Sequence, residues 1–370
     1  MKYSRLNSRR RARRPLGSPK PLWFVALMHL AALGLALVLF ALPHHVIPRH
    51  RESMGIVSER GAAPVSAADT AAPAAEPTSD PPTEAANAGE PADAAAATAE
   101  PAAEAEPTAE PRVGDFSAKF ADKFIQGEPV YTDTTYVSEN LNITLTDYNV
   151  NNVYFYVADI YIRDISCFRT AFAKDKFGRG YTEDIDSVAS RLNSVLTISG
   201  DYYGTRDDGV CVRNGEMYIN DKVYREIGVL YWDGTFQTFD KDTFDGTREM
   251  ANGAYQIWNF GPGVLDSDGN PRTSFPSFYD GITKRQPRAA LGYFEPGHYC
   301  FIAVEGRLSR SRGLSLTEMG KLAQNLGLQQ LYNLDGGKTA MMAFGTTVVN
   351  TPPAGGRPCS DYLTILDSIS

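Results

Sequence analysis

The sequence from residue 113 onward has almost no histidine, and this scarcity excludes several enzyme classes. The chain holds 5 histidines, and only His298 lies beyond residue 113. Zinc hydrolase sites of the histidine-rich kind therefore lack their ligands. A Ser-His-Asp triad would have to use His298, and no G-x-S-x-G segment supplies a serine. Because it stands next to a predicted turn, we expect His298 to be a solvated surface residue.

Two phosphate- and metal-binding motifs are also missing. The sequence has 4 cysteines but no C-x-x-C pair, so a zinc cluster is not expected. The segment Gly336-Gly337-Lys338-Thr339 matches the end of a P-loop, but that pattern needs a glycine where Tyr332 stands. ATP binding through a P-loop is thus excluded. A glycine-rich turn can still present backbone N–H groups to a phosphate.

One long apolar run is present near the N-terminus. Residues 22–42 are almost purely apolar and long enough to cross a bilayer as a helix. Residues 1–21 carry lysines and arginines and no acid, so they are expected to stay in the cytoplasm while the remainder is exported. A cleaved signal peptide is the alternative, but it needs small residues after its apolar core, and Pro43-His44-His45-Val46 follows here. We therefore expect a single-pass anchor in the cell membrane.

The next segment, residues 43–112, is rich in alanine, proline and glutamate and has few large apolar residues. Such a composition cannot bury enough surface to offset the entropy of ordering, so we expect a disordered, extended tether. The tether could hold a domain away from the membrane, for example through a cell-wall layer. Residues 113–370 then form one large domain. The basic tail is a topology signal that also touches anionic lipid, and no nucleic-acid partner is expected.

All four cysteines lie in this domain. An even number in an exported domain suggests disulfides. We expect Cys300 to pair with Cys359, since both lie in the C-terminal half beside predicted strands, and Cys167 to pair with Cys211 by elimination. Four buried thiols are the alternative.

Short strands and tight turns dominate residues 113–370. Predicted strand pairs are 210–212 with 217–219, 229–232 with 235–239, and 289–293 with 298–304, each around a glycine-containing turn. Helices are predicted at 115–125, at 184–195, and between Ser315, which has capping-box spacing to Glu318, and Gly327. No βαβ rhythm and no internal repeat occur. The fold class is therefore α+β, with mixed, largely antiparallel sheets and two or three helices.

The segment 329–345 is the centre of the functional prediction. An apolar run ending at Leu334 indicates a buried strand, and Asp335 follows it directly, before two glycines that permit a sharp turn and close approach of another molecule. An ordinary hairpin turn is the alternative.

Other charged residues stand at further predicted strand ends. These are Glu305 and Arg307 after one strand, Arg288 before another, and Asp201 in the turn after Ser199. If these strands are neighbours, their ends form one polar cleft. Carboxylates there suit cleavage of a glycosidic bond, and arginines suit a phosphate. Solvated surface charges are the alternative for each residue taken alone.

Several motifs together resemble one known family. They are P-R-A-A-L-G at 287–292, V-E-G-R at 304–307, G-L-S-L at 313–316 and Y-N-L-D-G-G at 332–337, with S-G-D-Y-Y at 199–203, F-G-P at 260–262 and Arg357. In order and spacing, residues 195–366 resemble the phosphodiester glycosidase family, whose bacterial members are often labelled exopolysaccharide proteins. The resemblance implies hydrolysis of a sugar–phosphate diester at the sugar–oxygen bond.

The resemblance also assigns roles. Asp335 is the expected acid/base or nucleophile, Glu305 its carboxylate partner, and Asn333 orients Asp335 or the sugar. Arg288 and Arg307 are expected to clamp phosphate. The remaining substrate-binding candidates are Gly336, Gly337, Lys338, Thr339, Ser199 and Asp201.

The sequence departs from the family pattern at four of these positions. Ser199 stands in place of an asparagine, Glu305 in place of an aspartate, Lys338 in place of a third glycine and Thr339 in place of a serine. A non-catalytic module that binds envelope polymer is therefore the alternative function, and a tethered regulatory or assembly protein is a third. No cofactor is expected, and a divalent cation is possible without being demanded. The expected partner is a sugar-phosphate or cell-wall glycopolymer.

Overall fold

The computed structural model describes residues 22–41, 48–62, 64 and 112–369. They fall into two units, divided between Arg49 and His50. The first unit contains helix α1 (Leu22–Ala41), which coincides with the predicted anchor. Within the described residues, no helix qualifies as a membrane span. The anchor therefore stays a prediction, and the basic tail at 1–21 lies outside the described residues.

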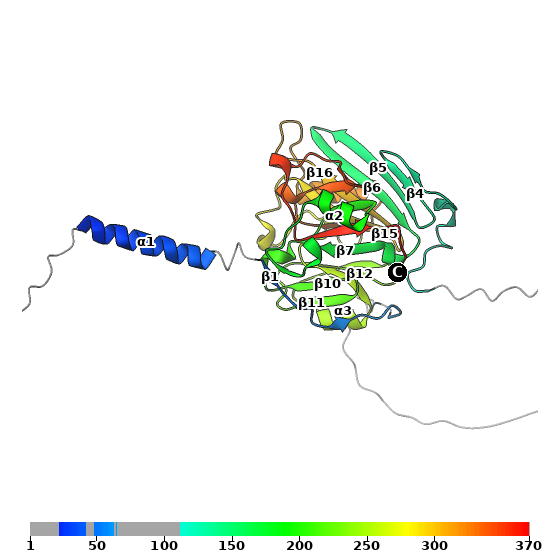
Figure 1. The fold of residues 1–370 in the computed structure, drawn as a ribbon. Coiled ribbons are helices and arrows are strands. Elements are labelled where there is room, and N and C mark those ends of the chain that lie inside the picture. Colours follow the sequence, from blue (N-terminus) through cyan, green and yellow to red (C-terminus); the bar gives the residue numbers. More distant parts are fainter. Residues whose placement is uncertain (1–21, 42–47, 63, 65–111, 370) are drawn as a thin grey trace, which may run out of the picture. The chain divides into compact units, whose positions relative to one another are not determined.

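Three antiparallel sheets make up most of the second unit (Figure 1). The six-stranded sheet has the order β13 (Phe236–Phe239), β12 (Ile227–Tyr231), β14 (Ala254–Trp258), β10 (Val210–Arg213), β11 (Glu216–Asn220), β2 (Ile56–Val57). The seven-stranded sheet has the order β17 (Gln330–Asn333), β15 (Arg288–Glu295), β16 (His298–Val304), β6 (Val153–Ile162), β5 (Leu141–Val150), β4 (Thr135–Val137), β3 (Val130–Tyr131). The five-stranded sheet has the order β19 (Thr347–Val348), β18 (Met342–Phe344), β9 (Leu196–Ser199), β20 (Asp361–Ile365), β7 (Phe168–Phe172). Two short strands, β1 (Arg49–His50) and β8 (Gly178–Arg179), lie outside these sheets.

The three sheets share one hydrophobic core. Alternate residues along each strand point to opposite faces, so one face of every sheet can be apolar. Leu230 from β12, Leu291 from β15 and Leu363 from β20 all belong to the same buried cluster. The sheets therefore pack face to face, and burial of this shared apolar surface is the main stabilising term of the unit.

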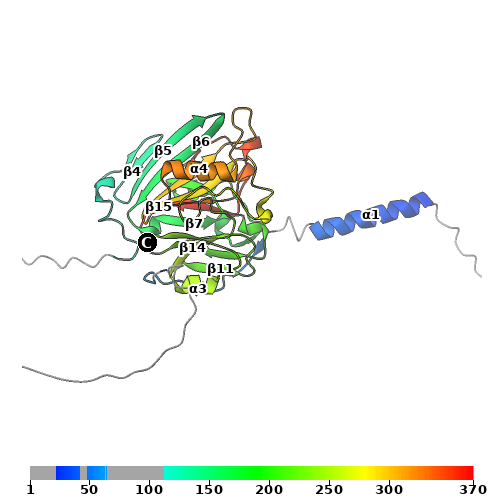
Figure 2. The ribbon, with the colours of Figure 1, turned by 180° about the vertical axis from the view of Figure 1, so that it is seen from behind.

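A helix covers the other face of each sheet. Helix α4 (Leu316–Leu326) packs on the seven-stranded sheet, as Figure 2 shows from behind. Helices α2 (Ile185–Leu192) and α3 (Gly246–Ala251) pack on the five- and six-stranded sheets. The prediction of α4 is confirmed in detail: its N-terminus has the Ser315–Glu318 capping box, and Gly327 ends it at φ +76°.

Most predicted strand pairs are confirmed, including β10–β11, β12–β13 and β15–β16. The predicted helix at 115–125 is wrong, because only the 3-10 turn η3 (Ala121–Lys123) forms there. Phe116 and Phe120 are buried in the shared core, and this packing overrides the helical spacing of the phenylalanines. His298 also differs from expectation: its ring stacks between Tyr161 and Phe294.

The predicted disulfides are wrong, since all four cysteines are free, buried thiols. Cys300 packs under α4, whereas Cys359 packs against α2. Cys167 lies in the shared core and Cys211 in a separate aromatic cluster. The members of each expected pair therefore belong to different packing layers. Burial raises the pKa of each thiol.

Part of the predicted tether is folded. Strand β2 adds to β11, where Ile56 pairs with Met217 and Val57 with Glu216. Ser58 is buried beside it. Residues 50–62 therefore differ from the expected disordered segment, because this short stretch supplies apolar and hydroxyl side chains that match an open sheet edge. Most of the remaining tether, residues 65–111, lies outside the described residues.

Arg60 and Arg112, which lie on either side of residues 63–111, contact the same buried carboxylate. Arg60 Nη2 lies 2.6 Å and Arg112 Nη2 lies 2.8 Å from Asp164 Oδ2. Arg60 Nε also donates to the Val113 carbonyl oxygen at 2.7 Å. Burial raises the pKa of Asp164, but hydrogen bonds from Arg60 and Ser166 outweigh it, so the net pKa is lowered. We call Arg60, Arg112, Val113 and Asp164 the clasp.

Candidate active site

The ends of three adjacent strands bring the predicted residues together. In the register of the seven-stranded sheet, Arg288 on β15 pairs with Val304 on β16, and Ala290 pairs with Asn333 on β17. The strands are antiparallel, so the start of β15 lies beside the ends of its two neighbours. The residues that follow β16 and β17 therefore reach the same edge.

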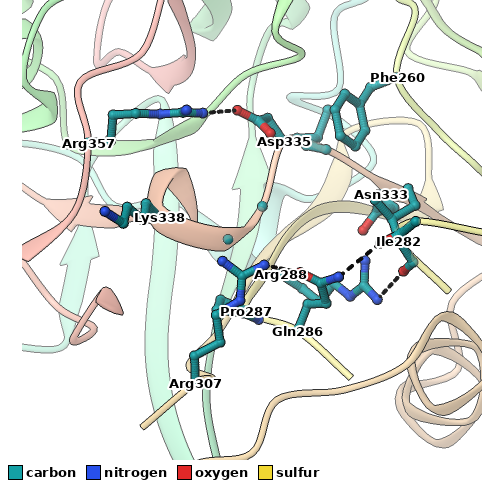
Figure 3. Close-up of a pocket in the computed structure, with 14 residues that line it drawn as sticks. Phe260, Ile282, Gln286, Pro287, Arg288, Arg307, Asn333, Asp335, Lys338 and Arg357 are labelled. Atoms are coloured by element: carbon teal, nitrogen blue, oxygen red, sulfur yellow. Dashed lines mark hydrogen bonds and ion pairs between the residues drawn. The ribbon is translucent and has the colours of Figure 1, made fainter. Parts of the chain in front are cut away.

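A cavity of about 380 Å³ lies at this edge (Figure 3). It is lined by most of the predicted site residues, namely Arg288, Arg307, Asn333, Asp335, Gly336, Gly337 and Lys338. Sequence reasoning gave no role to the other lining residues, which include Phe260, Ile282, Gln286 and Arg357. Of the charged residues expected at one cleft, Arg288, Arg307 and Asp335 meet here, whereas Glu305 and Asp201 do not line the cavity.

Asp335 is held rigidly at the cavity wall. Its N–H donates to the Gly200 carbonyl oxygen at 3.0 Å, and Thr339 Oγ1 donates to its Oδ2 at 2.8 Å. Arg357 Nη2 lies 3.5 Å from the same oxygen. Burial raises the pKa of Asp335 to about 6, against the opposing effects of Thr339 and Arg357. The carboxyl group is thus mostly ionised at pH 7, and it can accept a proton there.

The two glycines after Asp335 are required by close contacts. A Cβ on Gly336 would lie 2.6 Å from the Pro287 carbonyl oxygen. Gly337 has φ +71°, and a Cβ there would lie 3.3 Å from Arg307 Nη1. Glycine therefore lets the turn pass against β15 and lets the Arg307 guanidinium lie over it. The 3-10 turn η8 (Gly337–Thr339) that follows carries Lys338 at the cavity wall.

Arg288 is a buried cation with no carboxylate partner among the described residues. Its guanidinium donates to the carbonyl oxygens of Leu314 at 2.9 Å, Ile282 at 2.6 Å and Lys284 at 2.6 Å. Burial, together with the nearby charge of Arg307, lowers its pKa to about 10. Carbonyl oxygens fix the side chain but leave its charge uncompensated. Such a site attracts an anion.

The cavity as a whole is strongly basic. Arg307 donates to Gln286 Oε1 from a backbone in the left-handed region, at φ +58°. Together with Arg288, Lys338 and Arg357 it faces a single acid, Asp335, among the described lining residues. Four cations around one carboxylate suit an anionic ligand such as a phosphate.

Glu305 does not line this cavity, contrary to its predicted partnership with Asp335. It is fully buried, and its two carboxylate oxygens accept from Arg310 at 2.9 and 2.5 Å. The Thr351 N–H donates to the same group at 2.6 Å. Its carboxylate is therefore bound by groups from two neighbouring loops, Arg310 and the Thr351 N–H. The linear sequence does not show this pairing, which keeps Glu305 out of the cavity.

Three other predicted residues support the cavity from behind. Thr339 contacts Asp335 as described, and Ser199 Oγ donates to the Thr339 carbonyl oxygen. Asp201 is buried, with Arg213 Nη2 2.8 Å from its Oδ1 and the Asn259 N–H donating to its Oδ2 at 3.0 Å. None of the three lines the cavity, so the structure does not place them where they were predicted to contact a substrate.

Phe260 and Arg357 could have been found from the sequence. Phe260 precedes a Gly-Pro turn, and the Arg225 guanidinium lies 4.9 Å above its ring. Both residues belong to the family-like motifs, but neither stands at the end of a predicted strand next to an acid. Within the described residues, no group of three potential ligands could hold a metal ion.

The residues of this site lie within a match to a known protein family. A family model described as phosphodiester glycosidase matches residues 193–366, which include most of the cavity wall. A curated relative, the SPbeta prophage-derived uncharacterized protein YomE of Bacillus subtilis (strain 168), is 28% identical over 196 residues. That match covers 51% of this chain and 30% of the relative, so the chain spans less than a third of that protein.

Two solved structures are also similar. One is the zebrafish N-acetylglucosamine-1-phosphodiester alpha-N-acetylglucosaminidase catalytic domain auto-inhibited by its pro-peptide, with 17% identity, a TM-score of 0.48, and coverage of 62% of this chain and 83% of that chain. The other is a hypothetical protein from Synechocystis, with 13% identity, a TM-score of 0.47, and coverage of 61% and 62%.

Proposed function

Because the resemblance of residues 193–366 to the phosphodiester glycosidase family is confirmed, we propose that this chain hydrolyses a glycosyl phosphodiester at the sugar–oxygen bond. The observation that supports the proposal most is Arg288, a buried arginine with no carboxylate partner in the described part of the chain, in the same cavity as Asp335. The cation suits the phosphate, and the carboxylate suits proton transfer at the sugar.

One carboxylate is sufficient for this reaction because the leaving group is a phosphate. Ordinary glycosidases use a second carboxylic acid to protonate a poor leaving oxygen. Here a water oxygen attacks the anomeric carbon as the carbon–oxygen bond breaks, and the bonding electrons leave with the phosphate monoester. Arg288, Arg307 and Lys338 would stabilise its negative charge. Asp335 takes the proton released by the water.

The location of the reaction is part of the proposal. The apolar segment at 22–42, with basic residues before it, supports a cell-membrane anchor that keeps the N-terminus in the cytoplasm. The catalytic unit would then work outside the cytoplasm, on a sugar-phosphate polymer or a glycosylated wall component, including exopolysaccharide.

A binding module of the same fold is the second candidate function. It is favoured by Glu305, which is neutralised by Arg310 and so leaves Asp335 as the one described acid of the cavity. A cavity with four cations could retain an anionic glycopolymer without cleaving it.

The products formed from a test substrate distinguish the glycosidase from the binding module. The full chain, purified in detergent, is given a sugar joined through phosphate to an aryl group. The proposed glycosidase releases free sugar and aryl phosphate, and water labelled with oxygen-18 places its label on the sugar. Asp335→Asn should lower kcat at least about 100-fold, the usual contribution of a proton-transfer group, while the exposed Asp186→Asn control retains activity.

Three results would speak against the proposal. Release of aryl alcohol and sugar phosphate means cleavage at phosphorus instead of carbon. Tight binding of the polymer with no turnover supports the binding module. Full activity in Asp335→Asn, with an unchanged thermal unfolding curve, removes Asp335 from the mechanism.

A further inference from the structure

One polar atom in the cavity wall has no partner among the described protein atoms. Asn333 is 1% exposed, and its Nδ2 donates to the Gly261 carbonyl oxygen at 3.0 Å. Its Oδ1 is buried and makes no hydrogen bond. Because buried polar groups in proteins are nearly always paired, this oxygen marks a place where a ligand atom belongs.

A 180° rotation of the Asn333 side-chain amide would not give this oxygen a partner. Asn333 is the last residue of β17, its N–H donates to the Pro262 carbonyl oxygen at 3.0 Å, and it pairs with Ala290 of β15. Rotating the amide by 180° would set Oδ1 against the Gly261 carbonyl oxygen, two acceptors without a hydrogen between them. The protein therefore presents an acceptor, and only an acceptor, to the cavity at this point (Figure 3).

A phosphodiester cannot satisfy that acceptor. At neutral pH it carries oxygens and no hydrogen, so it offers nothing to Asn333 Oδ1. A hydroxyl or an amide N–H of a sugar does offer one. Phe260, at the same wall and one residue before Gly261, adds an aromatic ring of the kind that packs on apolar C–H faces.

The charged groups define another part of the cavity. Arg307 extends over Gly337, and Lys338 follows on η8. Figure 3 shows Asp335 with Arg357 on one side, Asn333 on another, and Arg307 below the turn. The cavity thus has an acceptor at Asn333 and cations at Arg307 and Lys338, and the buried Arg288, which bonds to the Ile282 carbonyl oxygen, is a further cation of the same cavity.

We infer that Asn333 is the specificity-determining acceptor for the glycosyl group, so that substrate binds in one orientation, with the sugar at Asn333 and Phe260 and the phosphate at the cations Arg288, Arg307 and Lys338. This inference rests on the proposed function for the identity of the ligand. It adds a requirement: the sugar must carry a hydroxyl or amide hydrogen that reaches Asn333 Oδ1. A site built around such a bond rejects an analogue that lacks the donor.

The test measures binding, so it does not depend on turnover. Calorimetry compares three probes, glucose, N-acetylglucosamine and inorganic phosphate, on the full chain in detergent. Asn333→Leu should weaken binding of the preferred sugar about tenfold, the effect of one lost hydrogen bond to a buried acceptor, and leave phosphate affinity unchanged. Lys338→Met should do the reverse. Asn220→Leu, which removes a hydrogen bond to Thr247 on α3, is the matched control.

A double-mutant cycle then locates the donor, because residues in direct contact show non-additive effects. Monodeoxy forms of the bound sugar are tested on wild-type and Asn333→Leu chains. One deoxy position should lose about tenfold on wild type and nothing further on the variant.

Several outcomes overturn the inference. These are no sugar binding to wild type, equal weakening of sugar and phosphate by Asn333→Leu, or additive losses at every deoxy position. If Asn333→Leu does not fold, the deoxy series on the wild-type chain still decides: one position should lose about tenfold if the inference holds, and no single position stands out if it is wrong. Failure of the proposed function looks different: the binding pattern holds, but the aryl diester is not cleaved.

Discussion

Asp335 shows how one residue acquires its chemistry from its surroundings. The sequence places it after a strand and before two glycines, and this position was enough to select it. Its pKa, however, depends on burial, on the Thr339 hydroxyl and on Arg357, which lies 22 positions later in the chain. The sequence does not indicate that these groups meet, so the raised pKa could not be predicted from it.

The first prediction concerns pH. If Asp335 accepts a proton, activity requires its ionised form, and kcat should fall as the pH drops through about 6. Arg357 lowers the pKa of Asp335, so Arg357→Met should move the midpoint of this acidic limb to higher pH. Initial rates from pH 4 to 9 measure both. A midpoint that stays in place in Arg357→Met contradicts the assigned role of the ion pair.

At the level of strands and loops, Glu305 shows that a residue's position in the sequence does not determine the direction of its side chain. Its place after β16 predicted a substrate-facing carboxylate, and the same reasoning selected Asp335 after β17, which does line the cavity. Arg310, five residues later, binds both of its oxygens, and the Thr351 N–H approaches from a separate loop. Strand ends can be read from turns and apolar runs, but the direction of a side chain beyond the strand depends on contacts that are distant in sequence.

The strands themselves were easier to predict than the sites. The β10–β11 turn has the Asn-Gly pair that favours positive φ at both central residues, and the structure has φ +54° at Asn214 and +85° at Gly215. Helix α4 carries its own start and stop signals. The cysteines carry no comparable local signal, because an even number does not place two sulfur atoms in one packing layer.

The second prediction concerns the loops that Glu305 joins. One carries Arg307, and the other leads from Thr351 to Arg357, so their shared contact to Glu305 positions two cavity cations. Arg310→Met should raise KM for the aryl diester about tenfold, since it leaves a buried carboxylate unpaired and frees both loops, with a smaller effect on kcat. The control is Arg285→Met, which removes the more exposed ion pair with Glu318. Equal KM values in the two variants would show that the contact does not order the site.

At the scale of the whole molecule, the clasp shows that part of the predicted tether belongs to the folded unit. Residues 50–62 are part of the folded unit, through β2 and through Arg60. The chain then leaves at residue 62 and returns at residue 112 to the same carboxylate, Asp164. The two segments on either side of residues 63–111 are thus joined by the domain, and not only by the residues between them.

The third prediction follows from this connection. A protease site placed near residue 87 allows the chain to be cut there. The N-terminal fragment should remain bound to the rest in gel filtration, because β2–β11 pairing and the Arg60–Asp164 ion pair hold it. Arg60→Met should increase dissociation of the cut protein at least tenfold, the usual effect of losing a charge-assisted hydrogen bond. Immediate separation of the wild-type fragments would disprove the role of the clasp.

The free-energy cost of closing a loop between two fixed points depends only weakly on the length of the loop. Ring-closure entropy rises only with the logarithm of the number of residues, so doubling the stretch between Arg60 and Arg112 would cost about 0.6 kcal/mol. Neither the sheet register nor the cavity would need to adjust. A foreign sequence inserted between Arg60 and Arg112, such as an affinity tag or a fluorescent domain, should therefore leave the fold around Asp335 unchanged.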